Sequence, residues 1–169
     1  MFRRWPVLLL ACLWLLAGAC GPQPDLKAHL KIEPVLTGYY DDGVIANGEN
    51  RLLPSMTFRF RNDGEIPISN VSLIVSFWLV GADGEKESKQ IRGIGSEPLA
   101  PGATSEPITV RSSFGYTSPY PRAEFFTHSR FVDFYLKAFA KRRGTSIPIG
   151  EFPIDRRLLP AARRDGSRP

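Results

Sequence analysis

Residues 56–79 read MTFRFRNDGEIPISNVSLIVSFWL, and this stretch decides the fold because its side chains alternate in polarity. Residues 56–61 place one methionine and two phenylalanines on one side and threonine and two arginines on the other. This pattern predicts a β-strand with one buried and one wet face. Asn62-Asp63-Gly64 ends it as a turn, and residues 71–79 then predict a longer strand, with the more apolar Ile74 and Trp78 on its outer face.

Similar patterns on both sides of this stretch predict the remaining strands, at residues 28–36, 87–91, 108–110, 131–141 and 147–154. Turn-forming pairs punctuate them: Asp42-Gly43, Asn47-Gly48, Asp83-Gly84, Pro101-Gly102 and Arg143-Gly144. No long stretch has the three-and-four spacing of a capped helix. We therefore predict an all-β protein: an immunoglobulin-like antiparallel β-sandwich of about seven strands, in one domain over residues 26–155.

The N-terminus has the parts of a secretory signal. Two arginines near the start precede an uncharged apolar run of about thirteen residues, which ends in Ala17-Gly18-Ala19 before Cys20. A helix that spans a bilayer needs roughly 20 residues, so a cleaved signal peptide over residues 1–19 is the better interpretation.

Ala17-Gly18-Ala19-Cys20 resembles the lipobox of bacterial lipoproteins, although alanine stands where leucine is usual. The resemblance implies that Cys20 is acylated and begins the mature chain, with residues 20–25 as a tether. By resemblance to enterobacterial lipoproteins, Gly21 rather than aspartate after the cysteine implies the outer membrane rather than the inner, with the domain facing the periplasm. Leu10-Ala11-Cys12 is a weaker rival site, and a soluble secreted protein with an unpaired Cys20 is the alternative.

Residues 58–110 are similar to FxLYD and related Ig-like domains of bacterial envelope proteins. The shared pieces are Asn62-Asp63-Gly64, Ile68-Ser69-Asn70-Val71, Asp83-Gly84 and Leu99-Ala100-Pro101-Gly102. The Phe-x-Leu-Tyr-Asp signature is missing, and Phe77-Trp78-Leu79-Val80 stands near its place. The resemblance implies a sandwich that binds or presents rather than catalyses, in a family without an assigned function.

The composition of the chain limits the functions that it can have. Two of the 22 lysines and arginines lie in the leader, so 20 stand against 17 acidic residues, a formal charge of +3 that does not indicate a nucleic-acid partner. With Cys20 acylated, the domain has no free thiol or disulfide. We expect no enzymatic activity, metal or cofactor. A hydrolase using His128 and Ser129 is the least favoured hypothesis, because no nucleophile motif accompanies them.

Residues 39–50 gather oxygen-rich side chains among glycines, which calcium could use as ligands. The spacing fits no EF-hand loop, and hairpin turns are the better interpretation.

Residues 112–130 form the strongest candidate for a binding site, since long structured loops are often functional. This loop combines aromatic side chains with arginine, as the centres of interfaces do. The candidate partner-binding residues are Tyr116, Tyr120, Arg122, Phe125 and Phe126. The two phenylalanines have a stronger alternative, which is to cap the open end of the sandwich.

Residues 156–169 carry five arginines and predict a basic, flexible tail that is solvated rather than functional. Docking on anionic lipid or on an acidic partner is the alternative.

Taken together, these features favour a non-enzymatic envelope lipoprotein that is tethered to the membrane and acts as a protein-interaction or assembly subunit. The alternative is a lipid- or glycan-binding module of the periplasm that uses the aromatic 112–130 loop in a concave pocket.

Overall fold

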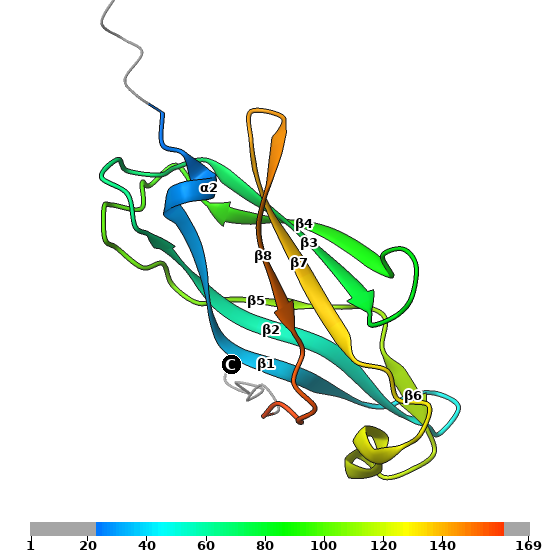
Figure 1. The fold of residues 1–169 in the computed structure, drawn as a ribbon. Coiled ribbons are helices and arrows are strands. Elements are labelled where there is room, and N and C mark those ends of the chain that lie inside the picture. Colours follow the sequence, from blue (N-terminus) through cyan, green and yellow to red (C-terminus); the bar gives the residue numbers. More distant parts are fainter. Residues whose placement is uncertain (1–22, 161–169) are drawn as a thin grey trace, which may run out of the picture.

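A computed structural model describes residues 23–160, which form two antiparallel four-stranded sheets packed face to face (Figure 1). The first sheet has the order β1-β2-β5, with β6 also paired to β2, and the second has the order β4-β3-β7-β8. The elements are α2 (Leu26–His29), β1 (Leu30–Val44), β2 (Asn50–Asn62), β3 (Val71–Leu79), β4 (Glu87–Ile94), β5 (Ile108–Arg111), β6 (Tyr116–Ser118), the 3₁₀ helix η1 (Arg122–Thr127), β7 (Phe134–Arg142) and β8 (Thr145–Pro153).

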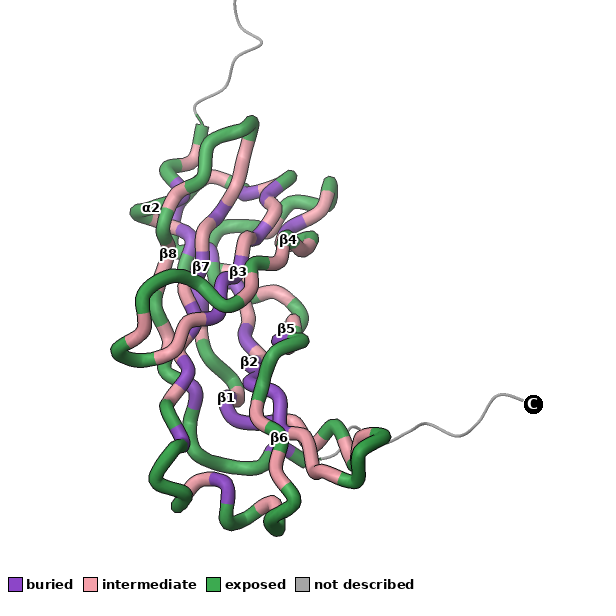
Figure 2. Tube along the Cα trace, turned by 90° about the vertical axis from the view of Figure 1, so that its right-hand side faces the viewer, coloured by how far each residue is buried: buried purple, intermediate pink, exposed green. Residues whose placement is uncertain are grey.

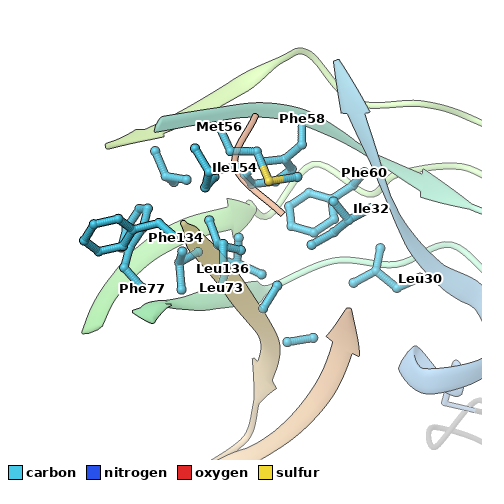
Figure 3. Close-up of a cluster of buried hydrophobic side chains, with 14 of the residues drawn as sticks. Leu30, Ile32, Met56, Phe58, Phe60, Leu73, Phe77, Phe134, Leu136 and Ile154 are labelled. Carbon is cyan, nitrogen blue, oxygen red and sulfur yellow. The ribbon is translucent and has the colours of Figure 1, made fainter. Parts of the chain in front are cut away.

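The core lies between the two sheets and is built from the alternating residues that the sequence indicated. Met56, Phe58 and Phe60 of β2 are at most 1% exposed, and they face the buried side chains of β3 and β7 (Figure 3). Each such side chain contributes about 1.5–3 kcal/mol when it is fully buried. Figure 2 shows the same division along the chain, with buried positions inside the sheets and exposed positions in the hairpins and loops. The predicted all-β sandwich is confirmed, while its immunoglobulin-like assignment stays a prediction.

Most of the predicted turns are present. Arg142 pairs with Thr145 across a two-residue turn in which Arg143 (φ 49°) and Gly144 (φ 86°) both have positive φ, as a type I′ hairpin requires. Asn47-Gly48 lies in the hairpin between β1 and β2, where Gly48 donates to the carbonyl of Ile45.

One predicted turn is wrong. Asp42-Gly43 does not reverse the chain, because β1 continues to Val44. The register instead shifts between Asp41 and Gly43, and Gly43 (φ 89°) donates its N–H to Oδ1 of Asp41. The pair therefore makes a β-bulge inside the strand, which is another use of a glycine with positive φ.

The number of strands and the start of β7 also differ from expectation. Residues 23–160 form eight strands rather than about seven, and the additional strand is the three-residue β6, which the sequence did not indicate. The seventh strand begins at Phe134 rather than at residue 131, since Tyr116 binds the backbone of Val132 and holds it out of the sheet.

The structure gives the sandwich two distinct ends (Figure 1). The proximal end is formed by α2 and the β7–β8 turn, where the described chain begins. The distal end is formed by the β1–β2 hairpin, β6 and η1. β1 runs from one end to the other, and its 15 residues at roughly 3.3 Å each span about 45–50 Å.

Both borders of the predicted domain carry further contacts. Asp25, the last residue of the predicted tether, caps α2 by accepting from the N–H groups of Lys27 and Ala28 at 2.9 and 3.3 Å. Residues 156–160 of the predicted flexible tail pack on β1: Tyr39 donates to the carbonyl of Arg157, and Leu159 donates to that of Tyr39. The packed chain thus extends past residue 155, whereas residues 1–22 and 161–169, with Cys20, lie outside the described part.

Candidate partner-binding site

The 112–130 loop is fixed at its start by Glu87 of β4. The carboxylate of Glu87 accepts from Oγ of Ser112 and from the N–H of Ser113, both at 2.7 Å, and it pairs with Lys89 at 3.1 Å. Burial opposes ionisation of Glu87, but hydrogen bonds from Ser113 and Ser112 outweigh it and lower the pKa of this carboxyl group. This carboxylate joins the edges of the two sheets and sets the course of the loop.

Tyr116 supports the distal end rather than projecting from it. Its hydroxyl donates to the carbonyl of Val132 and accepts from the N–H of the same residue, and its ring packs on Phe131 with 4.6 Å between centroids. Burial raises the pKa of Tyr116. The hydroxyl already has a donor and an acceptor within the fold, so the structure gives Tyr116 a positioning role.

Phe125 and Phe126 close the end of the sandwich, as the capping alternative predicts. Phe125 is 4% exposed, and the ring of Phe126 lies 5.4 Å from those of both Tyr39 and Phe131. Phe125 has almost no surface left for a partner, because its ring belongs to the core.

Arg122 is taken up by an ion pair. Its Nε lies 2.5 Å from Oδ2 of Asp41, and both side chains are about one-third exposed. Asp41 lies near the end of β1, so this pair ties η1 to the β1–β2 hairpin. A partner would have to compete with Asp41 for this guanidinium group.

Arg156 makes a similar brace from the other side. Its Nε and Nη2 donate to the two carboxylate oxygens of Asp133, at 2.7 and 2.9 Å, and Nη1 donates to the carbonyl of Phe126. The hydrogen bonds from Arg156 lower the pKa of Asp133. This arginine, which the sequence placed in a solvated tail, holds the end of η1 against the start of β7.

Of the five predicted residues, Tyr120 is the one displayed to solvent, with 51% of its surface exposed. Its ring stacks on that of His128, with 5.7 Å between centroids and 30° between planes. The backbone of Tyr120 is held in place by the side chain of Asn50, whose Nδ2 donates to the carbonyl of Tyr120 at 2.9 Å. Tyr120 therefore offers a supported aromatic surface.

A groove of about 560 Å³ runs beside this aromatic pair. It is lined by residues 116–120 on one side and 128–131 on the other, together with Phe125. The two segments come from β6 and from the chain between η1 and β7. The sequence indicated the loop but not the groove. The groove forms only because the fold brings residues 116–120 and 128–131 together, and His128 and Arg130 did not stand out in the sequence.

Five exposed apolar side chains belong to segments at the distal end, and one of them, Tyr120, lines the groove. They come from the end of β1, the residue after β3, the 112–130 loop and the chain just before β7, namely Val44, Val80, Phe114, Tyr120 and Val132. Val80 belongs here because its N–H donates to the carbonyl of Asp133. Sequence reasoning missed Val44, Val80 and Val132, because each is a single apolar residue near the end of a strand.

A second aromatic cluster lies on the outer face of the β4-β3-β7-β8 sheet. Trp78 and Tyr135 stack with 6.2 Å between centroids, and the ammonium group of Lys137 lies 4.6 Å from the Trp78 ring centre. Lys137 also pairs with Glu151 at 3.2 Å. The apolar residues on the predicted wet face of these strands are thus partly covered by their neighbours.

The oxygen-rich residues 39–50 are engaged within the fold. Asp41 pairs with Arg122, and Asp42 lies 3.7 Å from Arg51. Nδ2 of Asn47 donates to Glu49 at 2.7 Å. Within residues 23–160, no cluster of three or more histidine, cysteine or acidic side chains is arranged to hold a metal ion.

The two histidines lie at opposite ends of the sandwich, His29 in α2 and His128 after η1. Nδ1 of His128 accepts from the N–H of Arg130 at 3.1 Å. No hydrogen bond or ion pair in the described part of the chain joins His128 to a carboxylate, as a triad would require.

Comparison with known protein families, curated proteins and solved structures finds no match to this chain. Neither helical segment of residues 23–160 is long and apolar enough to cross a membrane.

Proposed function

We propose that this protein is a non-enzymatic bacterial envelope lipoprotein, tethered by acyl chains on Cys20, which binds a protein partner through its distal end. The observation that carries this proposal is that five exposed apolar side chains belong to segments of the distal end, which lies opposite to the start of the described chain (Figure 1). Large exposed apolar groups mark interaction sites when they cluster. One of them, Tyr120, stacks on His128 in the wall of the groove, and its carbonyl accepts a hydrogen bond from Asn50.

The positions of the tether and of the proposed binding site are consistent with this function, because they lie at opposite ends of the sandwich. Only two residues separate Cys20 from Gln23, so an acylated Cys20 keeps α2 and the β7–β8 turn close to the membrane surface. β1 then carries the distal end about 45–50 Å away. Such a module presents its site to a partner in the periplasm. The outer membrane is the favoured site of anchoring, and nucleic acid is not a proposed partner.

The strand order supports the immunoglobulin-like part of the proposal. β1, β2 and β5 share one sheet while β3, β4, β7 and β8 form the other, so the chain crosses between sheets after β2, β4 and β6. Crossings of this kind are typical of Greek-key sandwiches, which include binding domains of many cell surfaces. The resemblance to FxLYD-like domains points the same way.

Crosslinking in living cells tests the proposal. A photo-reactive residue at Tyr120 is expected to capture one envelope protein, which mass spectrometry identifies. The matched control is Thr145, which is exposed at the proximal end. Equal capture at both positions, or none at Tyr120, contradicts a distal partner site.

The tether has its own test. Cys20→Ser is expected to release the protein from the membrane fraction and to remove the mass of the acyl chains. If the variant stays in the membrane fraction with an unchanged mass, the lipoprotein part of the proposal is wrong.

The groove favours a second candidate, in which the same end binds a lipid or glycan. It is concave, and the hydroxyl-bearing residues 117, 118 and 129 line it together with Tyr120 and His128. Titration with cell-wall fragments or lipid, followed by NMR shifts of the loop amides, distinguishes this candidate. Saturable shifts confined to residues 116–131 support it.

A further inference from the structure

The groove has an unpaired sheet edge along one side. β6 pairs with β2, through Leu52↔Tyr116, Arg51↔Thr117 and Asn50↔Ser118, and with no other strand of the described chain. Its second edge is therefore open, and the same three residues line the groove. An open strand edge presents backbone N–H and C=O groups that another extended chain can pair with.

The groove also carries a positive charge that the fold leaves unbalanced. Arg122 and Arg156 both have carboxylate partners, whereas no carboxylate of residues 23–160 lies within ion-pair distance of Arg130. None of the residues lining the groove is acidic.

His128 adds a hydrogen-bond donor to this wall. Because its Nδ1 accepts from the backbone of Arg130, the proton of the neutral ring is on Nε2. The charge and the donor both suit an anionic ligand.

We propose that the groove binds an extended, acidic peptide segment of the partner, which adds as a strand to the open edge of β6. The inference rests on the proposed function and names the chemistry of the partner. Three residues of β6 span about 10 Å, enough to pair with three or four residues of the segment. Carboxylates of the segment reach Arg130, and Tyr120 packs against its side chains.

A peptide fits these groups better than an acidic glycan does. The open edge offers donors and acceptors in strict alternation, and a peptide backbone supplies the complementary alternation at the same spacing. Hydroxyl groups of a sugar do not repeat at this distance. Strand addition and charge complementarity together select an acidic peptide.

A peptide array tests the inference with the full-length protein in detergent. The array carries heptapeptides whose first five positions vary over valine, threonine, serine, alanine and leucine. In one half the last two positions are aspartate or glutamate, and in the other half they are lysine or arginine. The acidic half is expected to bind selectively, and the strongest acidic peptide is expected to bind at least tenfold tighter than its basic counterpart by fluorescence anisotropy. Equal binding of the two halves, or none, overturns the proposal.

Two controls separate strand addition from simple charge attraction. N-methylation of alternate backbone nitrogens in the peptide removes its donors, and we expect it to abolish binding. Arg130→Glu is expected to lose the acidic peptide, while the matched variant Arg92→Glu, which reverses an exposed charge on β4, is expected to keep it. Undiminished binding of the N-methylated peptide, or equal effects of the two variants, contradicts the proposal.

The same reagents separate this inference from the proposed function. If Tyr120 captures a protein in cells and Arg130→Glu leaves that capture unchanged, the distal site stands and the peptide groove is wrong. If an oligogalacturonate binds in the groove and the acidic peptides do not, the ligand is a glycan, and the peptide proposal is wrong. Loss of the acidic peptide together with loss of cellular capture in Arg130→Glu supports both.

Discussion

At the scale of single residues, Glu87 anchors the start of the 112–130 loop by its charge and its hydrogen bonds. Its side chain is 12% exposed and accepts hydrogen bonds from both Ser112 and Ser113. Glu87→Gln keeps the shape but turns one acceptor into a donor that faces other donors. We expect a loss of about 1–2 kcal/mol in the free energy of unfolding at pH 7, measured by urea denaturation.

The pH dependence of this effect has a definite sign. The pKa of Glu87 is lowered on folding, so between the two pKa values the unfolded chain binds more protons than the folded one. The stabilisation is therefore complete above the unfolded pKa, about 4.5, and is lost as the pH falls through the folded pKa. The difference between wild type and Glu87→Gln should shrink below pH 4.5, whereas the exposed control Glu97→Gln should differ little from wild type throughout. A constant difference for Glu87→Gln down to pH 3 would contradict this account.

Tyr116 and Tyr120 allow a matched comparison between a tyrosine that supports the fold and one that is exposed to solvent. Tyr116→Phe removes the hydroxyl that binds both backbone groups of Val132, and should cost about 1 kcal/mol because water can partly replace it. Tyr120→Phe should change stability by less than about 0.5 kcal/mol, as surface substitutions usually do. Hydrogen exchange at the Val132 amide should rise in the first variant alone. Equal exchange in the two variants would remove the supporting role of Tyr116.

At the scale of elements, β6 depends on a glycine just before it. A Cβ on Gly115 would collide with the carbonyl oxygen of Leu52, the residue with which Tyr116 pairs. Gly115→Ala should therefore push β6 away from β2 and destabilise the fold by about 1–3 kcal/mol.

Gly95 is the matched control, because a Cβ there meets nothing within 4 Å. Gly95→Ala should be neutral within about 0.5 kcal/mol. If the array experiment finds acidic peptides that bind, Gly115→Ala should also weaken them, since it displaces the strand edge they use. Equal melting temperatures for the two alanine variants would show that β6 tolerates the side chain.

The elements also show what the sequence can and cannot predict. The bounds of β3, at residues 71–79, follow from its alternation. Its own residues show which side chains face the core and which face solvent, without reference to distant parts of the chain. β6 has only three residues between a glycine and a proline, too few for a period to be seen.

The candidate site was predictable as a loop but not residue by residue. Arg122 looked available because its partner, Asp41, lies in a distant hairpin, and Tyr116 looked available because its hydroxyl is used by a backbone group further along the chain. Such long-range contacts leave no local signature in the sequence. The groove itself exists only once β6 and residues 128–131 are brought together.

At the scale of the whole molecule, the two ends of the sandwich predict an orientation on the membrane. If Cys20 is acylated, residue 145 in the proximal turn lies near the lipid headgroups, and residue 120 lies about 45 Å further out. If cleavage before Cys20 also removes Cys12, the mature chain has no free cysteine, and Thr145→Cys and Tyr120→Cys each accept a single dye.

Energy transfer to acceptor-labelled headgroups measures this orientation in lipid vesicles. Transfer should be strong from position 145 and weak from position 120, because its efficiency falls steeply with distance. The same dyes on a Cys20→Ser background should show neither signal, since the protein no longer stays on the vesicle. Equal transfer from the two positions would mean that the sandwich lies flat on the membrane, where the distal groove could not face a partner in the periplasm.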